Sequence, residues 1–198
     1  IISIDPILFT NNSNQFFSDF PKKDFEEITY DKNTGIVYLS VEGNGEKFND
    51  YVGIYKLIFK DDDVLSKQVI SIEKMNFSPA SLFYKYTGWN IGYEGLALDD
   101  NYFYLGLEGF INNSQFSDST LIFIANKSDL NLIKKINTKS LGVHTICGLY
   151  SDENYSIWGI DRNNSMIFHI LFDEEFNIKS FTKFKGETFI PGYRTQNY

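Results

Sequence analysis

The chain repeats one structural unit three times, and this repeat constrains the fold more than any other feature of the sequence. Each copy contains a short strand, a turn rich in Asp, Asn and Gly, a second strand, and an acidic residue where that strand ends. The copies begin near residues 24, 90 and 145. Self-similarity with a period of about 50 residues is typical of propeller blades and other repeated arrays. The repeat therefore predicts a series of small, similar sheets.

Two further strands follow the repeated pair in each unit. They are bounded by Asn, Asp and Gly turns, and they cover residues 51–59, 64–72, 120–125, 130–136, 165–172 and 178–184. Four short antiparallel strands per unit match a β-propeller blade. A β-sandwich is the alternative all-β architecture, but it gives no reason for a repeated motif. We therefore predict an all-β β-propeller built from four-stranded antiparallel blades.

The length fits a single domain, 1–198, with successive blades at 24–89, 90–143 and 144–198. Residues 1–23 then form the tail of an incomplete blade. Because closed propellers usually have about four to eight blades, the ring either closes at the low end with both termini, lacks blades, or is completed by a partner chain. We expect a partial ring that lacks N-terminal blades, since the first strand arrives without its blade.

Composition excludes several classes of function. The net charge of −8 argues against nucleic-acid binding, which requires clustered Lys and Arg. No apolar run approaches membrane-spanning length. Cys147 is the only cysteine, so no internal disulfide can form. A chain with one cysteine and two histidines also lacks the ligands of a usual zinc site.

The repeated acids predict a site in the central channel, because the innermost strands of successive blades converge there. Glu26 and Glu94 occupy equivalent positions, and Cys147 takes that position in the third unit. A second equivalent set, where the next strand ends, is Glu42, Glu108 and Asp161. Ca²⁺ prefers six to eight oxygen ligands. The predicted metal ligands are therefore Glu26, Glu42, Glu94, Glu108 and Asp161.

A cation held in this way could bridge to a phosphate while an acid activates water. Arg162 is the first candidate for contacting phosphate oxygens, and Arg194 and His144 are further candidates. The predicted catalytic residues are thus Glu94, Glu108, Asp161 and Arg162. The alternative is structural, because a repeated Glu can accept backbone N–H bonds and tie one blade to the next.

Residues 90–98 read Asn-Ile-Gly-Tyr-Glu-Gly-Leu-Ala-Leu, and Leu-Gly-Leu-Glu-Gly follows at residues 105–109. This sequence closely resembles the central signature of the "esterase-like activity of phytase" domain family. Residues 24–28, followed by Glu42, resemble the preceding blade of that family, with Glu27 where the family has Gly. Residues 160–163 resemble a later element in which a strand ends on an acid beside an Arg. The SdiA-regulated (YjiK-like) propellers share much of this pattern.

The resemblance covers about residues 24–172. The sequence departs from the family in lacking its usual first blade or blades. It implies a β-propeller fold, phosphoester or ester hydrolysis, calcium as a cofactor, and an exported bacterial protein of the periplasm or cell envelope. A small-molecule phosphoester would then be the substrate. The alternative function is a non-catalytic exported propeller that binds a protein, a glycan or an envelope ligand through its loops.

Overall fold

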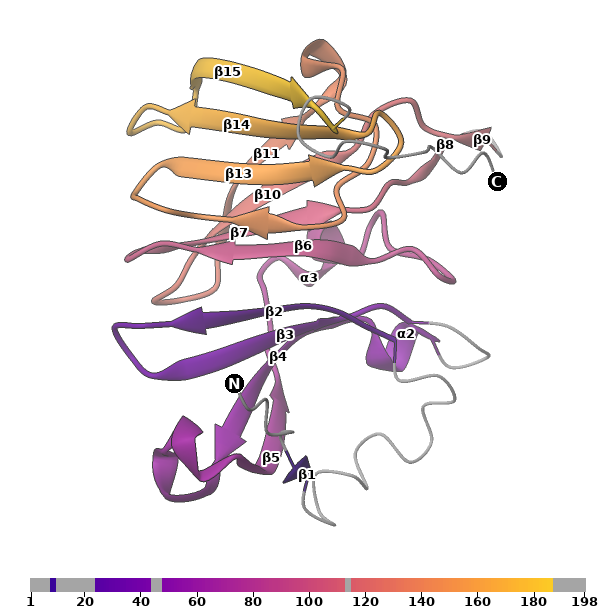
Figure 1. The fold of residues 1–198 in the computed structure, drawn as a ribbon. Helices are drawn as coiled ribbons and strands as arrows, with labels where there is room; N and C mark the ends of the chain where they lie inside the picture. The colour runs from indigo at the N-terminus through magenta and orange to yellow at the C-terminus, as the bar shows by residue number, and fades with distance from the viewer. Residues whose placement is uncertain (1–7, 10–23, 44–47, 113–114, 187–198) are drawn as a thin grey trace.

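The computed structural model describes residues 8–9, 24–43, 48–112 and 115–186. Its described residues form three main β-sheets, which lie one above another in Figure 1. The first sheet has the order β1-β5-β4-β3-β2. Its strands are β1 (Leu8–Phe9), β2 (Phe25–Asp31), β3 (Ile36–Val41), β4 (Gly53–Phe59) and β5 (Gln68–Lys74).

The second and third sheets have four strands each, in the orders β11-β10-β7-β6 and β12-β13-β14-β15. The strands of the second sheet are β6 (Tyr93–Leu98), β7 (Tyr102–Leu107), β10 (Leu121–Asn126) and β11 (Leu132–Asn137). Those of the third are β12 (Leu149–Tyr150), β13 (Ser156–Asp161), β14 (Met166–Phe172) and β15 (Ile178–Lys185). The short strands β8 (Ile111–Asn112) and β9 (Gln115–Phe116) form a separate hairpin.

Consecutive strands pair antiparallel within each main sheet, and the only parallel pair among the described strands joins β1 to β5. The innermost strands β2, β6 and β12 are also neighbours across the sheets. This is the arrangement of propeller blades around an axis. The predicted all-β fold of four-stranded antiparallel blades is therefore confirmed, as three blades of a partial propeller.

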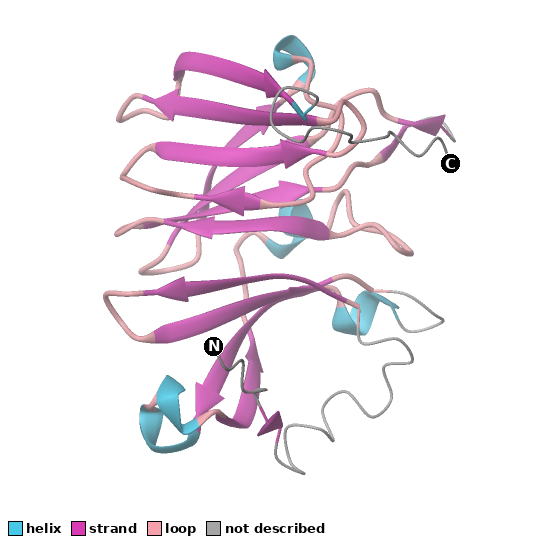
Figure 2. Ribbon diagram, in the orientation of Figure 1, coloured by secondary structure: helices cyan, strands magenta, loops and turns pink. Residues whose placement is uncertain are grey.

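Helices are a minor part of the structure, as Figure 2 shows. Both α-helices of the described chain, α2 (Phe48–Tyr51) and α3 (Ala80–Phe83), are a single turn long. The 3₁₀ turns lie at Lys60–Asp62, Val64–Ser66 and Lys139–Leu141. No helix of the described residues has the length and apolar character needed to cross a membrane.

The core fills the spaces between adjacent blades, because one cluster of buried side chains joins the first and second blades and another joins the second and third. Between the first and second blades, Tyr38 of β3 packs edge-on against Phe103 of β7, with ring centroids 5.0 Å apart. Between the second and third, Tyr104 stacks on Phe172. A fully buried Leu or Phe side chain contributes roughly 1.5–3 kcal/mol through burial. These layers of large side chains therefore fix the spacing of the blades.

Polar contacts tie the blades together at the hairpin turns. Asp100 accepts a hydrogen bond from Asn33 Nδ2 of the first blade at 2.6 Å and one from Asn154 Nδ2 of the third at 3.4 Å. Lys127, after β10, forms an ion pair with the buried Asp31 of the first blade, with Nζ 2.7 Å from Oδ2. The blades are thus held in register at the end of the strands opposite the repeated acids.

Candidate functional site: a carboxylate cluster at one channel mouth

The strand register shows which residues are equivalent in the three blades. In the second blade Leu96 of β6 pairs with Leu105 of β7. Glu94 lies two residues before Leu96, and Glu108 lies three residues after Leu105. In another blade, the counterpart of Glu94 lies two residues before the paired residue of the inner strand. The counterpart of Glu108 lies three residues after the paired residue of the next strand.

The same offsets identify the counterparts in the other blades. The reference pairs are Ile28 with Leu39 in the first blade and Leu149 with Gly159 in the third. Counting from these pairs gives Glu26 and Glu42 in the first blade and Cys147 and Arg162 in the third. The prediction that Asp161 is equivalent to Glu42 and Glu108 is therefore wrong by one residue. Arg162 occupies that position.

Three glutamates from two blades converge at this end of the channel. Carboxylate oxygens of Glu42, Glu94 and Glu108 all lie within 4.8 Å of one another. Glu42 follows β3, Glu94 lies in β6 and Glu108 follows β7. Their side chains are brought together because β2, β3 and β6 pack side by side. This group thus contains three of the five predicted ligands.

Two of these glutamates are buried without hydrogen-bond partners for one oxygen each. Glu42 is 3% exposed and Glu94 is 8% exposed. Oε1 of Glu42 and Oε2 of Glu94 make no hydrogen bond. An unpaired buried carboxylate oxygen is costly, and such groups in a folded protein are normally satisfied by a partner or an ion. These two oxygens are therefore the strongest indication of a ligand site.

A second group of carboxylates shares Glu42. Oxygens of Asp24, Glu26 and Glu42 also lie within 4.8 Å of one another. Asp24 and Glu26 are only half-buried. The two groups form one continuous patch of acidic oxygen atoms, which we call the carboxylate cluster: Asp24, Glu26, Glu42, Glu94 and Glu108.

The cluster perturbs its own acidity. Burial, with repulsion from Glu108 and Glu26, raises the pKa of Glu42 to about 8. Burial and the charge of Glu108 raise the pKa of Glu94 to about 8 as well, although Arg162 opposes the shift. The pKa of Glu26 is raised by burial and by Asp24. Like charges at close range disfavour ionisation, so a bound cation would be needed to keep all of these groups ionised near neutral pH.

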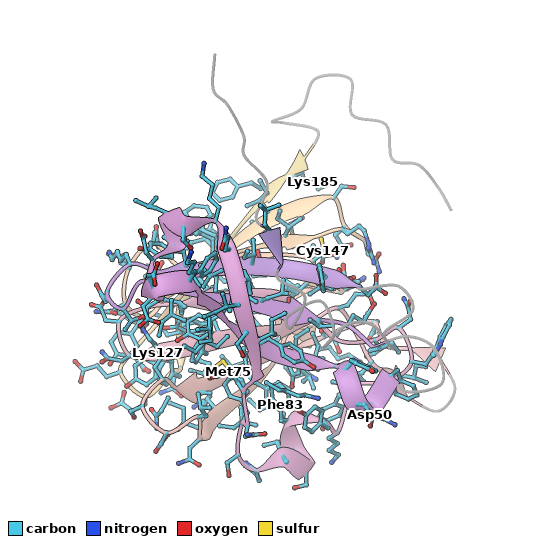
Figure 3. All side chains as sticks on the ribbon, turned by 90° about the horizontal axis from the view of Figure 1, so that it is seen from below. Asp50, Met75, Phe83, Lys127, Cys147 and Lys185 are labelled. Atoms are coloured by element: carbon cyan, nitrogen blue, oxygen red, sulfur yellow. The ribbon has the colours of Figure 1, made fainter. Side chains whose placement is uncertain are left out.

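Arg162 is the positively charged neighbour of the cluster. Its guanidinium Nη2 forms an ion pair with Glu108 Oε1. The Arg162 side chain is 56% exposed, whereas that of Glu108 is 13% exposed. Cys147, labelled in Figure 3, lies close enough for the charges of Glu94 and Arg162 to influence its thiol. Burial is the main cause of the raised pKa of this thiol, which is not the behaviour of an activated nucleophile.

Asp161 lies outside the two carboxylate groups and is fully buried. Its carboxylate accepts hydrogen bonds from His144 N at 2.7 Å, Thr145 Oγ1 at 3.1 Å and Asn164 N at 3.1 Å. Asn164 Nδ2 also donates to it at 2.7 Å. These contacts are those of a structural acid, which accepts hydrogen bonds and holds segments of the chain together. The oxygens of Asp161 join the segment before β12 to the β13–β14 turn.

The clearest structural acid is Glu27, which sequence reasoning did not select. Glu27 Oε2 of the first blade accepts hydrogen bonds from Leu96 N of the second blade at 2.6 Å and from Leu149 N of the third at 2.9 Å. Burial raises its pKa to about 7, against the effect of these two bonds. One carboxylate thus joins three blades. In the sequence, Glu27 differs from the other two copies of the repeat, which have Gly95 and Gly148 at the same position. This difference is the sequence feature that could have identified Glu27.

Of the remaining candidates, His144 uses its backbone N–H to bond Asp161, and Arg194 lies outside the described residues.

Comparison with known proteins gives no family for this chain. No family model matches the sequence, and no curated protein matches it. Among solved structures, an ancestral GH74 enzyme is similar with a TM-score of 0.49 and 14% identity over 81% of this chain. A luciferin-regenerating enzyme is similar with a TM-score of 0.44 and 12% identity over 84% of this chain. The dihydro-heme d1 dehydrogenase NirN is similar with a TM-score of 0.44 and 10% identity over 83% of this chain. The chain spans 19%, 62% and 28% of the lengths of these proteins, respectively.

Proposed function

We propose that the carboxylate cluster binds a divalent cation, Ca²⁺, and that the cation and Arg162 together hold an anionic phosphoester for hydrolysis. The observation that supports this proposal is that Glu42 and Glu94, each with one buried oxygen that has no hydrogen-bond partner, belong with Glu108 to a group whose carboxylate oxygens, one from each residue, lie within 4.8 Å of one another. This separation suits a shared ion, because Ca–O distances are about 2.3–2.6 Å. The phytase-like and ester-hydrolysing character that the sequence resemblance implies belongs to the same proposal.

The donor set fits calcium better than zinc. All members of the cluster offer carboxylate oxygens, and the nearest thiol, Cys147, belongs to neither carboxylate group. Oxygen-only sites favour Ca²⁺ and Mg²⁺, whereas zinc prefers His and Cys. Glu42, Glu94 and Glu108 would hold the ion, and Asp24 and Glu26 would extend the site toward solvent.

The chain's own groups supply the other parts of a hydrolytic site. A bound divalent cation would neutralise charge on the oxygens of the phosphoester. The Arg162 guanidinium can donate two parallel hydrogen bonds to such oxygens. Glu26 is half-buried and has a raised pKa, which suits a general base near neutral pH. A water oxygen would bond to phosphorus as the ester P–O bond breaks, and the proton that Glu26 accepts would pass to the leaving alcohol.

Calorimetric titration with Ca²⁺ tests the cation site directly. We expect the wild type to bind, and we expect a Glu42→Gln/Glu94→Gln variant to lose binding by more than about 100-fold, since each carboxylate is a direct ligand. Glu175→Gln, in the exposed turn before β15, is the matched control and should bind as the wild type does. Equal binding by all three proteins would contradict the proposal.

Catalysis requires a separate measurement. A panel of phosphomonoesters and carboxylic esters is assayed with the Ca²⁺-loaded protein, and Glu26→Gln is the test variant. Turnover that is lost in Glu26→Gln while calcium binding persists would support hydrolysis. Calcium binding without turnover of any ester would leave a cation-binding propeller and refute the enzymatic part.

The second candidate function is ligand binding without catalysis, and a different cavity favours it. A cavity of about 430 Å³ at the opposite mouth is lined by the inner hairpin turns of all three blades. Tyr30 and Tyr150 on its walls are 52% and 64% exposed, and Asp100 and Asn154 add polar groups. Exposed Tyr rings with amide and carboxylate groups suit a glycan or a peptide. Loss of glycan-array or peptide binding in Tyr30→Ala/Tyr150→Ala, with calcium binding intact, would support this role.

The exported location is part of the first proposal. The resemblance implies a periplasmic or cell-envelope protein of bacteria, and an extracellular compartment supplies the millimolar calcium that weak sites require. Fractionation of the producing cells tests it, because recovery in the cytosolic fraction alone would contradict it.

A further inference from the structure

The third blade breaks the acidic pattern of the channel mouth with an opposite charge. The position that holds Glu42 in the first blade and Glu108 in the second holds Arg162 in the third. Neighbouring positions of the ring therefore carry two carboxylates and one guanidinium. The guanidinium already contacts one of these carboxylates, Glu108.

We propose that Arg162 is the built-in counter-cation of the carboxylate cluster and that it exchanges with the divalent cation. In the cation-free state Arg162 lies against Glu108. When the cation binds, Glu108 turns its oxygen to the ion, and the released guanidinium becomes the group that binds the anionic ligand. This inference rests on the proposed cation site. It explains why the cation would bind first and the anion second.

The charges of the neighbouring groups support the exchange. Arg162 lowers the pKa values of both Glu94 and Glu26, against burial and the surrounding acids. Its charge thus reaches members of both carboxylate groups, not only its ion-pair partner. A divalent ion carries twice the charge of the guanidinium and can ionise the protonated acids of the cluster when it binds, so it has an electrostatic advantage over Arg162. Once the ion is present, Arg162 and the ion repel each other.

The structure allows the side chain to move while its backbone stays in place. The residues on both sides of Arg162 are anchored: Asp161 through its four hydrogen bonds, and Asn163 through its N–H to Thr145 Oγ1 at 3.3 Å. The Arg162 side chain itself is 56% exposed. A long side chain on a fixed, solvent-facing base can rotate away from Glu108 without disturbing the core.

The first test compares Ca²⁺ affinity in the wild type, Arg162→Gln and Lys139→Gln. Lys139 pairs with Asp118 on the surface at 3.6 Å, where both side chains are about 70% exposed, so its variant loses the same unit of charge elsewhere. We expect Arg162→Gln to bind Ca²⁺ about three- to tenfold more tightly, since a competing, partly exposed ion pair is removed. Lys139→Gln should differ from the wild type by less than about twofold, because exposed charges are screened.

The second test measures inorganic phosphate binding with and without saturating Ca²⁺. The wild type should bind phosphate at least about tenfold more tightly when calcium is present, because the ion itself and the released guanidinium both attract it. In Arg162→Gln most of the direct phosphate contact is absent, so the gain from calcium should shrink to about threefold or less. Arg162→Lys keeps the charge but not the planar fork and should lie between the two.

The outcomes separate this inference from the proposed function. A wild type that does not bind Ca²⁺ overturns both. A wild type that binds, with Arg162→Gln equal to Lys139→Gln, overturns the exchange alone. Weaker Ca²⁺ binding by Arg162→Gln also overturns it, since Arg162 would then hold Glu108 in position for the ion. Thermal melts of each variant check folding, which we expect to be unchanged for these exposed side chains.

Discussion

At the scale of single residues, the acids that this protein removes from solvent fall into two groups by their hydrogen-bond partners. Both oxygens of Asp161 accept hydrogen bonds, and Oε2 of Glu27 accepts two from backbone N–H groups. Glu42 and Glu94 are buried, as Asp161 is, but each keeps an oxygen without a partner. The hydrogen-bond partners, rather than burial or residue type, therefore separate structural acids from candidate ligands.

The pH dependence of stability should report the ligand acids. The pKa values of Glu42 and Glu94 are about 8 in the folded protein, against an ordinary value of 4.5. The folded state therefore retains protons that the unfolded state releases, and the free energy of unfolding should fall as pH rises from about 4.5 to about 8. Urea denaturation at several pH values with EDTA present measures this slope. Glu42→Gln/Glu94→Gln should reduce it and leave the part that Glu26 and Glu27 contribute through their own raised pKa values, and an unchanged slope would contradict the assignment.

Glu27 should matter for stability rather than for ligand binding. Glu27→Ala leaves the N–H groups of Leu96 and Leu149 without their acceptor, which should cost about 2 kcal/mol of unfolding free energy. Glu27→Gln keeps one acceptor oxygen and should cost less. Chemical denaturation measures both, and Glu175→Ala is the exposed control, with a change below about 0.5 kcal/mol. A loss of calcium binding without a loss of stability would be inconsistent with this role.

At the scale of elements, small residues on β6 and β7 allow the second and third blades to approach. A Cβ added at Gly106 would lie 2.6 Å from Ile146 Cγ2, and one at Gly95 would lie 2.7 Å from the same atom. Both distances are far below normal contact. The close fit places Leu149 N within reach of Glu27, so the packing of these strands and the three-blade hydrogen bonds depend on each other.

Gly106→Ala should therefore destabilise the protein by about 1–3 kcal/mol, because the added methyl group overpacks the interface. Gly148→Ala is the matched control: its added Cβ would meet no atom closer than 3.7 Å, and it should change stability by less than about 1 kcal/mol. Thermal or urea denaturation of the two variants makes the comparison. Equal effects would show that the contact at Ile146 does not limit the blade spacing.

At the scale of the whole molecule, the first and second blades supply the carboxylate cluster, and the third carries the opposing charge of Arg162. The third blade also has an apolar outer face, where Tyr150, Ile160 and Ile167 are 64%, 48% and 37% exposed. The aromatic residues Tyr38 and Tyr104, which face the next blade in the first two sheets, are only 7% and 0% exposed. Exposed apolar faces of this kind favour contact with another apolar surface.

Calcium should stabilise the assembled blades, since the ligands proposed for it, Glu42, Glu94 and Glu108, come from two of them. At a free Ca²⁺ concentration 100 times the Kd, binding to the folded state alone adds about 2.7 kcal/mol. For a chain of this size the midpoint of thermal unfolding should rise by roughly 5–10 °C. Differential scanning calorimetry with and without EDTA measures the shift. No shift in the wild type, or the same shift in Glu42→Gln/Glu94→Gln, would contradict a site that joins the blades.

The sequence by itself determined the repeat, the four strands of each blade and the acids where strands end. These features are local: alternating apolar residues and turn residues specify a strand pair whatever surrounds it. The same reasoning selected Glu42, Glu94 and Glu108, because strand ends of equivalent blades must converge at one mouth of the channel.

Only the tertiary structure decided the register and the partners. Irregular pairing between Phe25 and Ile28, and between Tyr93 and Gly95, shifts the inner strands by an amount that no local pattern records. In the third blade, the pairing of Leu149 with Gly159 puts Arg162 rather than Asp161 at the position of Glu42 and Glu108, so the charge at that position is reversed. The role of Glu27 depends on backbone groups 69 and 122 residues away. Contacts at such separations are set by how the blades pack.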